Sequence, residues 1–343
     1  MYSESDIDNA VTAGVLTPTV ATAFRNHVAA TRDTPAVDEE HFRLLTGFND
    51  IFVSIALVIL LMAVGQIGGR IAPGIGGAAI AAVAWGLAEF FTAKRRMALP
   101  SILLLLAFVG GIAGAVSLFG RELIGPDGSE RVQSLIAAVA AIAAAAGAWA
   151  HWRRFKVPIT IAAGVAALVG LLFALLLAAI PSAKEAIWPL LAIAGFGVFA
   201  LAMRWDLSDR QRITRRADVA FWLHLAAAPM IAHPIFQLLG VFGNDIGIGT
   251  ALVVLALYLA FGFIALAVDR RALLVSSLAY VLYAMYALVR TSGAVELSAA
   301  ITGLVIGSAL LSLSAFWQPM RRRVVGTLGD LGQRLPPVQL ATA

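Results

Sequence analysis

Long apolar runs alternate with short polar segments along most of the chain. Each run holds about 20 residues, which is roughly the length that crosses the hydrocarbon core of a bilayer as a helix. The runs lie near 48–68, 72–92, 100–119, 132–151, 158–180, 186–204, 219–241, 249–268, 272–290 and 296–317. The pattern therefore predicts an all-α, polytopic transmembrane helical bundle of about ten spans.

The composition agrees with lipid as the solvent of most of the chain. Of 343 residues, 60% are hydrophobic and 13% are charged, against ~45–50% and ~25% in soluble domains. The predicted partner is the lipid bilayer. The chain has no cysteine, which excludes disulfides and thiolate metal ligands.

The basic residues set the predicted orientation. Most of the 25 Lys and Arg residues flank the ends of the even-numbered runs or lie in the two tails. The exceptions are Arg70, Arg121, Arg131, Lys184 and Arg290. Because cytoplasmic flanks are enriched in Lys and Arg, we expect both termini in the cytoplasm. The same placement explains the basic pI without nucleic acid as a partner.

Three parts follow from this pattern: a cytoplasmic tail with two short helices at 1–46, a transmembrane domain at 47–318 and an interfacial tail at 319–343. In the first tail, Val20, Phe24 and Val28 form one apolar helix face. This face either docks on the chain's own membrane domain or serves a protein partner or self-association. In the second tail, the basic triplet Arg321–Arg323 favours anionic lipid at the cytoplasmic face.

The seventh run is the most unusual. It contains His224, His233 and Gln237, together with Pro229 and Pro234. Prolines free backbone carbonyls, so they predict a helix break of the kind found at transport sites. His233 and Gln237 share a face and form either a ligand or ion site or a structural polar pair. His224 lies on the opposite face from His233 in an ideal helix, and it is either a second candidate or a headgroup contact.

Two further sets of polar residues are candidate ligand contacts. Among the acidic residues, Glu89 lies clearly inside a predicted span. It either contacts a ligand or extends toward Lys94 and Arg96. Tyr280 and Tyr283 in the ninth run either line a polar crevice or make ordinary interhelical hydrogen bonds.

Known catalytic patterns are missing from the sequence. There is no HExxH pair, G-x-S-x-G elbow or Walker loop. We therefore predict no catalytic residue, no metal site and no cofactor, and the sequence gives little support to an enzyme.

Two segments carry a family resemblance: Ala13-Gly14-Val15-Leu16-Thr17-Pro18 before a short helix, and Asp269–Val275 at the start of a late span. With the stack of spans, they resemble a domain-of-unknown-function family of bacterial multi-pass inner-membrane proteins. The resemblance implies a bacterial inner membrane but no activity. Our leading hypothesis is a transporter-like or small-molecule-binding bundle. The alternative is a sensor or assembly component that acts through its N-terminal tail.

Overall fold

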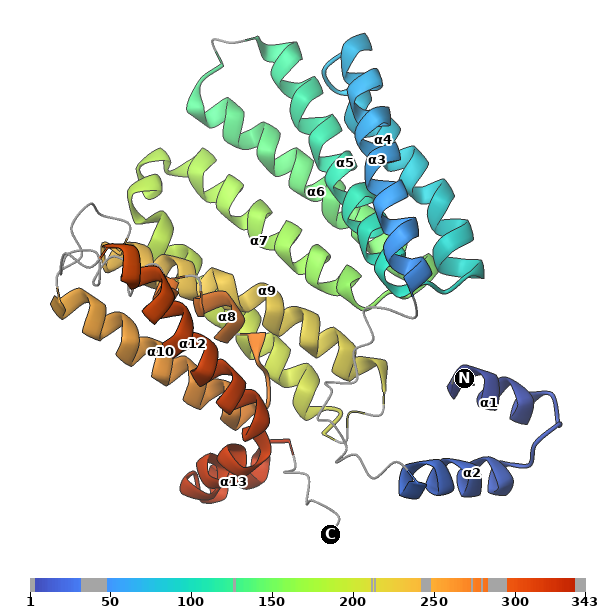
Figure 1. The fold of residues 1–343 in the computed structure, drawn as a ribbon. Coiled ribbons are helices and arrows are strands. Elements are labelled where there is room, and N and C mark those ends of the chain that lie inside the picture. Colours follow the sequence, from blue (N-terminus) through green and yellow to red (C-terminus); the bar gives the residue numbers. More distant parts are fainter. Residues whose placement is uncertain are drawn as a thin grey trace. The chain divides into compact units, whose positions relative to one another are not determined.

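The computed structural model describes residues 4–31, 48–125, 128–210, 212, 214–241, 248–272, 274–278, 280–282 and 295–336. These residues form helices and short connections (Figure 1). The chain divides into a unit at Met1–Phe42 and a unit at Arg43–Ala343. Each unit is considered by itself.

The N-terminal unit is a pair of helices, α1 (Glu4–Thr12) and α2 (Pro18–Thr31). Gly14 makes the turn after α1 with a φ of +71°, which costs glycine little. The Thr17 hydroxyl accepts a hydrogen bond from the Val20 amide and so caps α2. Arg25 donates to Asp8 at 2.7 Å and ties the helices together. The pair of helices expected in this tail is therefore present.

Seven helices of the second unit are long and apolar enough to cross a membrane. They are α3 (Phe48–Ile71), α4 (Ile75–Ala88) with its π-helical extension η1 (Glu89–Lys94), α5 (Ala98–Ile124), α6 (Glu130–Phe155), α7 (Ile159–Ala179), the 3₁₀ turn η2 (Pro181–Ala186) with α8 (Ile187–Leu207), and α9 (Arg215–Leu238). This confirms the helical membrane class. The spans predicted near 48–68 to 219–241 each coincide with one of these helices.

The C-terminal part adds α10 (Ile248–Val268), α12 (Val295–Ala315), α13 (Trp317–Thr327) and α14 (Asp330–Arg334). The helices α10 and α12 coincide with the eighth and tenth predicted spans. The ninth, at 272–290, lies partly outside the described residues. Tyr283, one of the candidate site residues, lies there too.

Consecutive helices pack as antiparallel neighbours from α3 to α7, and α8 packs on α9 (Figure 1). Helix α9 is the most enclosed of the seven. Within its most apolar stretch 56% of residues are buried, against 17–33% in the other six helices. Its small residues allow this, because Ala227, Ala228 and Ala232 leave room for α7 and α8. His224 and His233 of α9 therefore lie among side chains of other helices.

Candidate functional site

A buried ion-pair cluster joins helix ends that are far apart in the sequence. Asp206, at the end of α8, is fully buried. It accepts from Arg270 at 2.7 Å through Nη2 and at 3.2 Å through Nε. The Arg212 guanidinium lies 3.7 Å away from the same carboxylate. Arg270 also donates to the Ala217 carbonyl in the first turn of α9.

Asp269 extends the cluster to the C-terminal helices. Its carboxylate accepts from Arg212 at 2.7 Å and from the Trp317 indole at 2.8 Å. The Nε of Arg321 lies 3.4 Å from Asp269, and its Nη2 donates to the Pro336 carbonyl. Arg321 is fully buried, whereas Arg322 and Arg323 are exposed. Asp269 therefore holds the first arginine of the triplet inside the protein, and anionic lipid at this face stays a prediction that depends on Arg322 and Arg323.

His224 lies beside this cluster. It is 2% exposed, and its Nε2 is 3.6 Å from Asp206 Oδ2. The Phe199 ring packs edge-on against it with centroids 5.1 Å apart. A headgroup contact for His224 is excluded by this burial. The partners of the His224 and His233 rings differ, and their placement on opposite faces stays a prediction.

The cluster contains three guanidinium groups and two carboxylates. Such buried charges are stable only when paired and hydrogen-bonded, and removing one partner is costly. The arrangement can hold the ends of α8, α9, α10 and α13 in one register. Sequence reasoning missed Asp206 and Asp269 because both lie just outside the apolar runs, where charged residues are expected as simple flanks. The sequence feature that could have identified them is an acidic residue within a flank that is otherwise basic.

Glu89 has a partner other than the expected ones. Both of its oxygens accept from Arg154, at 3.0 Å from Nε and 2.6 Å from Nη2. Arg154 belongs to α6, so the expectation that Glu89 extends toward Lys94 and Arg96 on its own helix is wrong. Glu89 is also the first residue of the π-helix η1. Such π-helical turns are often found at functional sites, and a ligand contact for Glu89 stays a prediction.

His233 is hydrogen-bonded to a residue that the sequence analysis singled out for another site. Its Nδ1 lies 2.8 Å from the Tyr280 hydroxyl. The Trp188 ring packs against His233, and the Phe236 ring stacks on Tyr280. Gln237 is half-buried one turn further along α9. The structure thus brings His233 and Tyr280 together in an aromatic cluster. Their assignment to a ligand or ion site stays a prediction.

The two prolines do not break their helix. Helix α9 continues from Arg215 to Leu238 with Pro229 and Pro234 inside it. The predicted break is therefore wrong. Helix α9 packs against α7 and α8, and such neighbouring helices allow prolines within a membrane helix.

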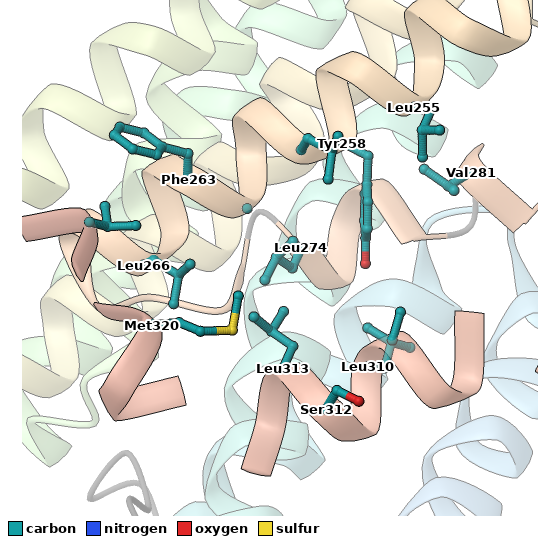
Figure 2. A pocket seen from close by; sticks show the side chains of 14 residues that line it. Leu255, Tyr258, Phe263, Leu266, Leu274, Val281, Leu310, Ser312, Leu313 and Met320 are labelled. Atoms are coloured by element: carbon teal, nitrogen blue, oxygen red, sulfur yellow. The ribbon is translucent and has the colours of Figure 1, made fainter. Parts of the chain in front are cut away.

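A pocket of about 500 Å³ lies between α10, α12 and α13 (Figure 2). Its wall is apolar except at Tyr258 and Ser312. Tyr258 points into it from α10, and its buried hydroxyl has no hydrogen-bond partner in the described part of the chain. The lining residues are Leu255, Tyr258, Leu259, Gly262, Phe263, Leu266, Leu274, Val281, Ala309, Leu310, Ser312, Leu313, Met320 and Val324. Such a wall suits a largely apolar ligand with one hydrogen-bond acceptor.

The described residues contain no group of three or more His, Asp or Glu side chains placed to hold a metal ion. Neither a protein-family model, a curated protein nor a solved structure matches the chain. The family resemblance given by the sequence therefore stays a prediction, and function has to be argued from the geometry alone.

Proposed function

We propose that this chain is a ten-span protein of the bacterial inner membrane with both termini in the cytoplasm, and that it binds a hydrophobic small molecule between its last helices. Two ion pairs between helix ends support this topology. Glu89 and Arg154 join two ends that the charge pattern assigns to the cytoplasm. Lys184 and Glu130, 2.9 Å apart, join two ends assigned to the opposite side.

The contacts of Asp269 support a count of ten membrane spans. Asp269 follows α10, and its partner Trp317 follows α12. Asp269 and Trp317 are therefore at the same end of the helices, and the chain between them has to return to that end. The proposed topology takes α12 as one crossing and places a second crossing between Asp269 and Val295. Ten spans supply it at 272–290.

Reporter fusions test this topology. We expect cytoplasmic reporters to be active after Arg96, Arg154 and Arg323, and inactive when inserted at 242–247. Reporters that place Arg96 and Arg154 on opposite sides of the membrane would contradict the proposed topology.

The pocket carries the proposed binding function. Its volume of about 500 Å³ falls within the roughly 300–1,000 Å³ of small-molecule sites. The Tyr258 hydroxyl is buried without a partner among the described residues, which is costly unless a ligand accepts from it. We therefore expect a long or polycyclic apolar molecule with a carbonyl or hydroxyl oxygen.

Filling the pocket tests this function. Purified full-length protein is incubated with a long-chain alcohol, an isoprenoid quinone and a sterol-like polycyclic alcohol, and its unfolding temperature is measured. A ligand that binds the folded state raises that temperature by mass action. Leu313→Trp fills the pocket, whereas Leu311→Trp changes a residue of the same helix that is 73% exposed and outside the lining.

We expect at least one of these compounds to stabilise the unmodified protein and Leu311→Trp, but not Leu313→Trp. Tyr258→Phe should weaken binding by about 5- to 10-fold, the effect of one lost hydrogen bond. Equal stabilisation of the two tryptophan variants would contradict binding in this pocket.

A second candidate function is association through the N-terminal tail. Val20 and Phe24 of α2 are 51% and 45% exposed, so α1 does not cover this apolar face. If it mediates self-association, Phe24→Asp should reduce the oligomer size of the full chain in detergent. Val15→Asp, at a 75% exposed position outside the face, should not. Unchanged oligomers in both variants would argue against self-association through this face.

A further inference from the structure

Two adjoining hollows lie at the end of α8 that the charge pattern assigns to the cytoplasm. The first, named the polar hollow, has a volume of about 380 Å³ and is lined by Leu201, Arg204, Trp205, Ser208 and Arg216. The second, named the apolar groove, is lined by Phe199, Ala200, Met203, Arg204, Leu207 and Ser208. Arg204 and Ser208 belong to both, so the two hollows form one continuous amphipathic surface.

The polar hollow carries positive charge that the described residues do not neutralise. Arg204 lies in the last turn of α8 and Arg216 lies in the first turn of α9. Both are exposed, and neither side chain has an ion-pair or hydrogen-bond partner within the described residues. They differ in this from Arg212 and Arg270, which Asp206 and Asp269 neutralise.

The nearby carboxylates are already engaged. Asp206 and Asp269 belong to the buried ion-pair cluster, and Asp209 accepts from the Thr214 hydroxyl and amide. Asp218 also has a partner. The start of α9 adds the positive end of a 24-residue helix. The polar hollow therefore favours an anion, and paired guanidinium groups suit phosphate oxygens.

The apolar groove indicates which kind of molecule carries the anion. Phe199, Met203 and Leu207 recur at intervals of four residues, so they lie on one face of α8. This face runs from Arg204 toward the middle of a candidate span. Trp205 lines the polar hollow, and tryptophan commonly meets lipid headgroups. An acyl chain can lie along the groove while its phosphate meets the two arginines.

We propose that this surface binds one anionic phospholipid, with its phosphate between Arg204 and Arg216 and an acyl chain along Phe199, Met203 and Leu207. Ser208 donates to the Trp205 carbonyl, so its oxygen remains able to accept from a glycerol hydroxyl of the headgroup. The site is separate from the pocket at Tyr258 and from the exposed Arg322 and Arg323.

Native mass spectrometry of the full-length protein in detergent tests the site. The lipids are phosphatidylglycerol and phosphatidylcholine with the same acyl chains. We expect phosphatidylglycerol to bind more tightly. The double variant Arg204→Gln with Arg216→Gln should weaken it by roughly 25- to 30-fold, since each arginine near a membrane surface contributes about a factor of five. The matched variant Arg322→Gln with Arg323→Gln removes the same charge and should leave the tight binding unchanged.

A third variant separates a phospholipid from a free anion. Ala200→Trp fills the apolar groove and keeps both arginines. It should weaken phosphatidylglycerol at least fivefold, and inorganic phosphate at millimolar concentration should not displace the lipid. Equal binding of the two lipids, equal effects of the two glutamine pairs, or displacement by inorganic phosphate would each overturn the proposal. Unfolding temperatures within a few degrees of the unmodified protein establish that each variant is folded.

Discussion

Asp206 and Arg270 form a two-point ion pair in the protein interior, although 64 residues separate them in the sequence. Asp206 is fully buried and Arg270 is 5% exposed. The pair links the end of α8 to the connection after α10, and Arg212 and Asp269 extend it toward α13. A planar guanidinium that meets both carboxylate oxygens fixes direction as well as distance. We infer that this pair sets the register of the helix ends.

Neutralising Asp206 should therefore destabilise the protein strongly. Asp206→Asn leaves Arg270 and Arg212 without their shared counter-charge in a buried site. The expected loss is about 3–5 kcal/mol, the usual cost of removing one partner of a buried ion pair. The measurement is thermal unfolding of the purified protein in detergent.

The control for this variant is Asp330→Asn at the start of α14, where the aspartate is exposed. It removes the same charge and should lower the unfolding free energy by less than about 1 kcal/mol. If the two variants unfold at the same temperature, the ion-pair cluster does not stabilise the fold in the way argued above.

Neutralising Glu89 should have a small effect on stability. The side chains of Glu89 and Arg154 are 35% and 53% exposed, and exposed ion pairs contribute about 0–1 kcal/mol. Glu89→Gln should therefore unfold close to the temperature of the unmodified protein. A loss comparable to that of Asp206→Asn would contradict this ranking. An effect on ligand binding with no effect on unfolding would favour a functional role for Glu89.

The hydrogen bond between His233 and Tyr280 should contribute modestly. Interhelical hydrogen bonds in membrane proteins average about 0.6 kcal/mol in double-mutant cycles. A cycle of His233→Phe, Tyr280→Phe and the double variant, read by thermal unfolding, should give a coupling of about 0.5–1.5 kcal/mol. A coupling near zero would mean that packing with Trp188 and Phe236, and not the hydrogen bond, places these rings.

The spans were predictable because their signal is local. A run of about 20 apolar residues with cationic flanks defines a helix without knowledge of its neighbours. The boundaries were less predictable. Helix α8, for example, continues to Leu207, beyond the end of its apolar run at Arg204, since Arg270 compensates the buried charge of Asp206.

The partners of polar residues were not predictable, because they lie on other helices. Glu89 was expected to meet cations on its own helix but meets Arg154, 65 residues away. His233 meets Tyr280, and Asp206 meets Arg270. Helical periodicity gives the face of a residue but not the neighbour of that face. The continuity of α9 through its prolines depends on neighbouring helices in the same way.

Close packing of α4 against α5 gives a final prediction from two adjacent glycines. A Cβ added at Gly111 would lie 2.7 Å from the Gly77 carbonyl oxygen and 2.9 Å from the Ala81 amide nitrogen. Both obstacles are backbone atoms of α4, so the helices have to move apart. At Gly110, the preceding residue of the same helix, a Cβ would meet nothing within 4 Å.

Gly111→Ala should therefore destabilise the protein by about 1–3 kcal/mol, the usual cost of overpacking. Gly110→Ala should be neutral or stabilise by up to about 1 kcal/mol, because alanine favours the helix over glycine. Thermal unfolding of the two variants under identical conditions compares them directly. Because lipid tails are as apolar as the helix surfaces, close backbone contact is what favours association here. Equal stability of the two variants would mean that α4 and α5 do not approach as closely as Gly77 and Gly111 indicate.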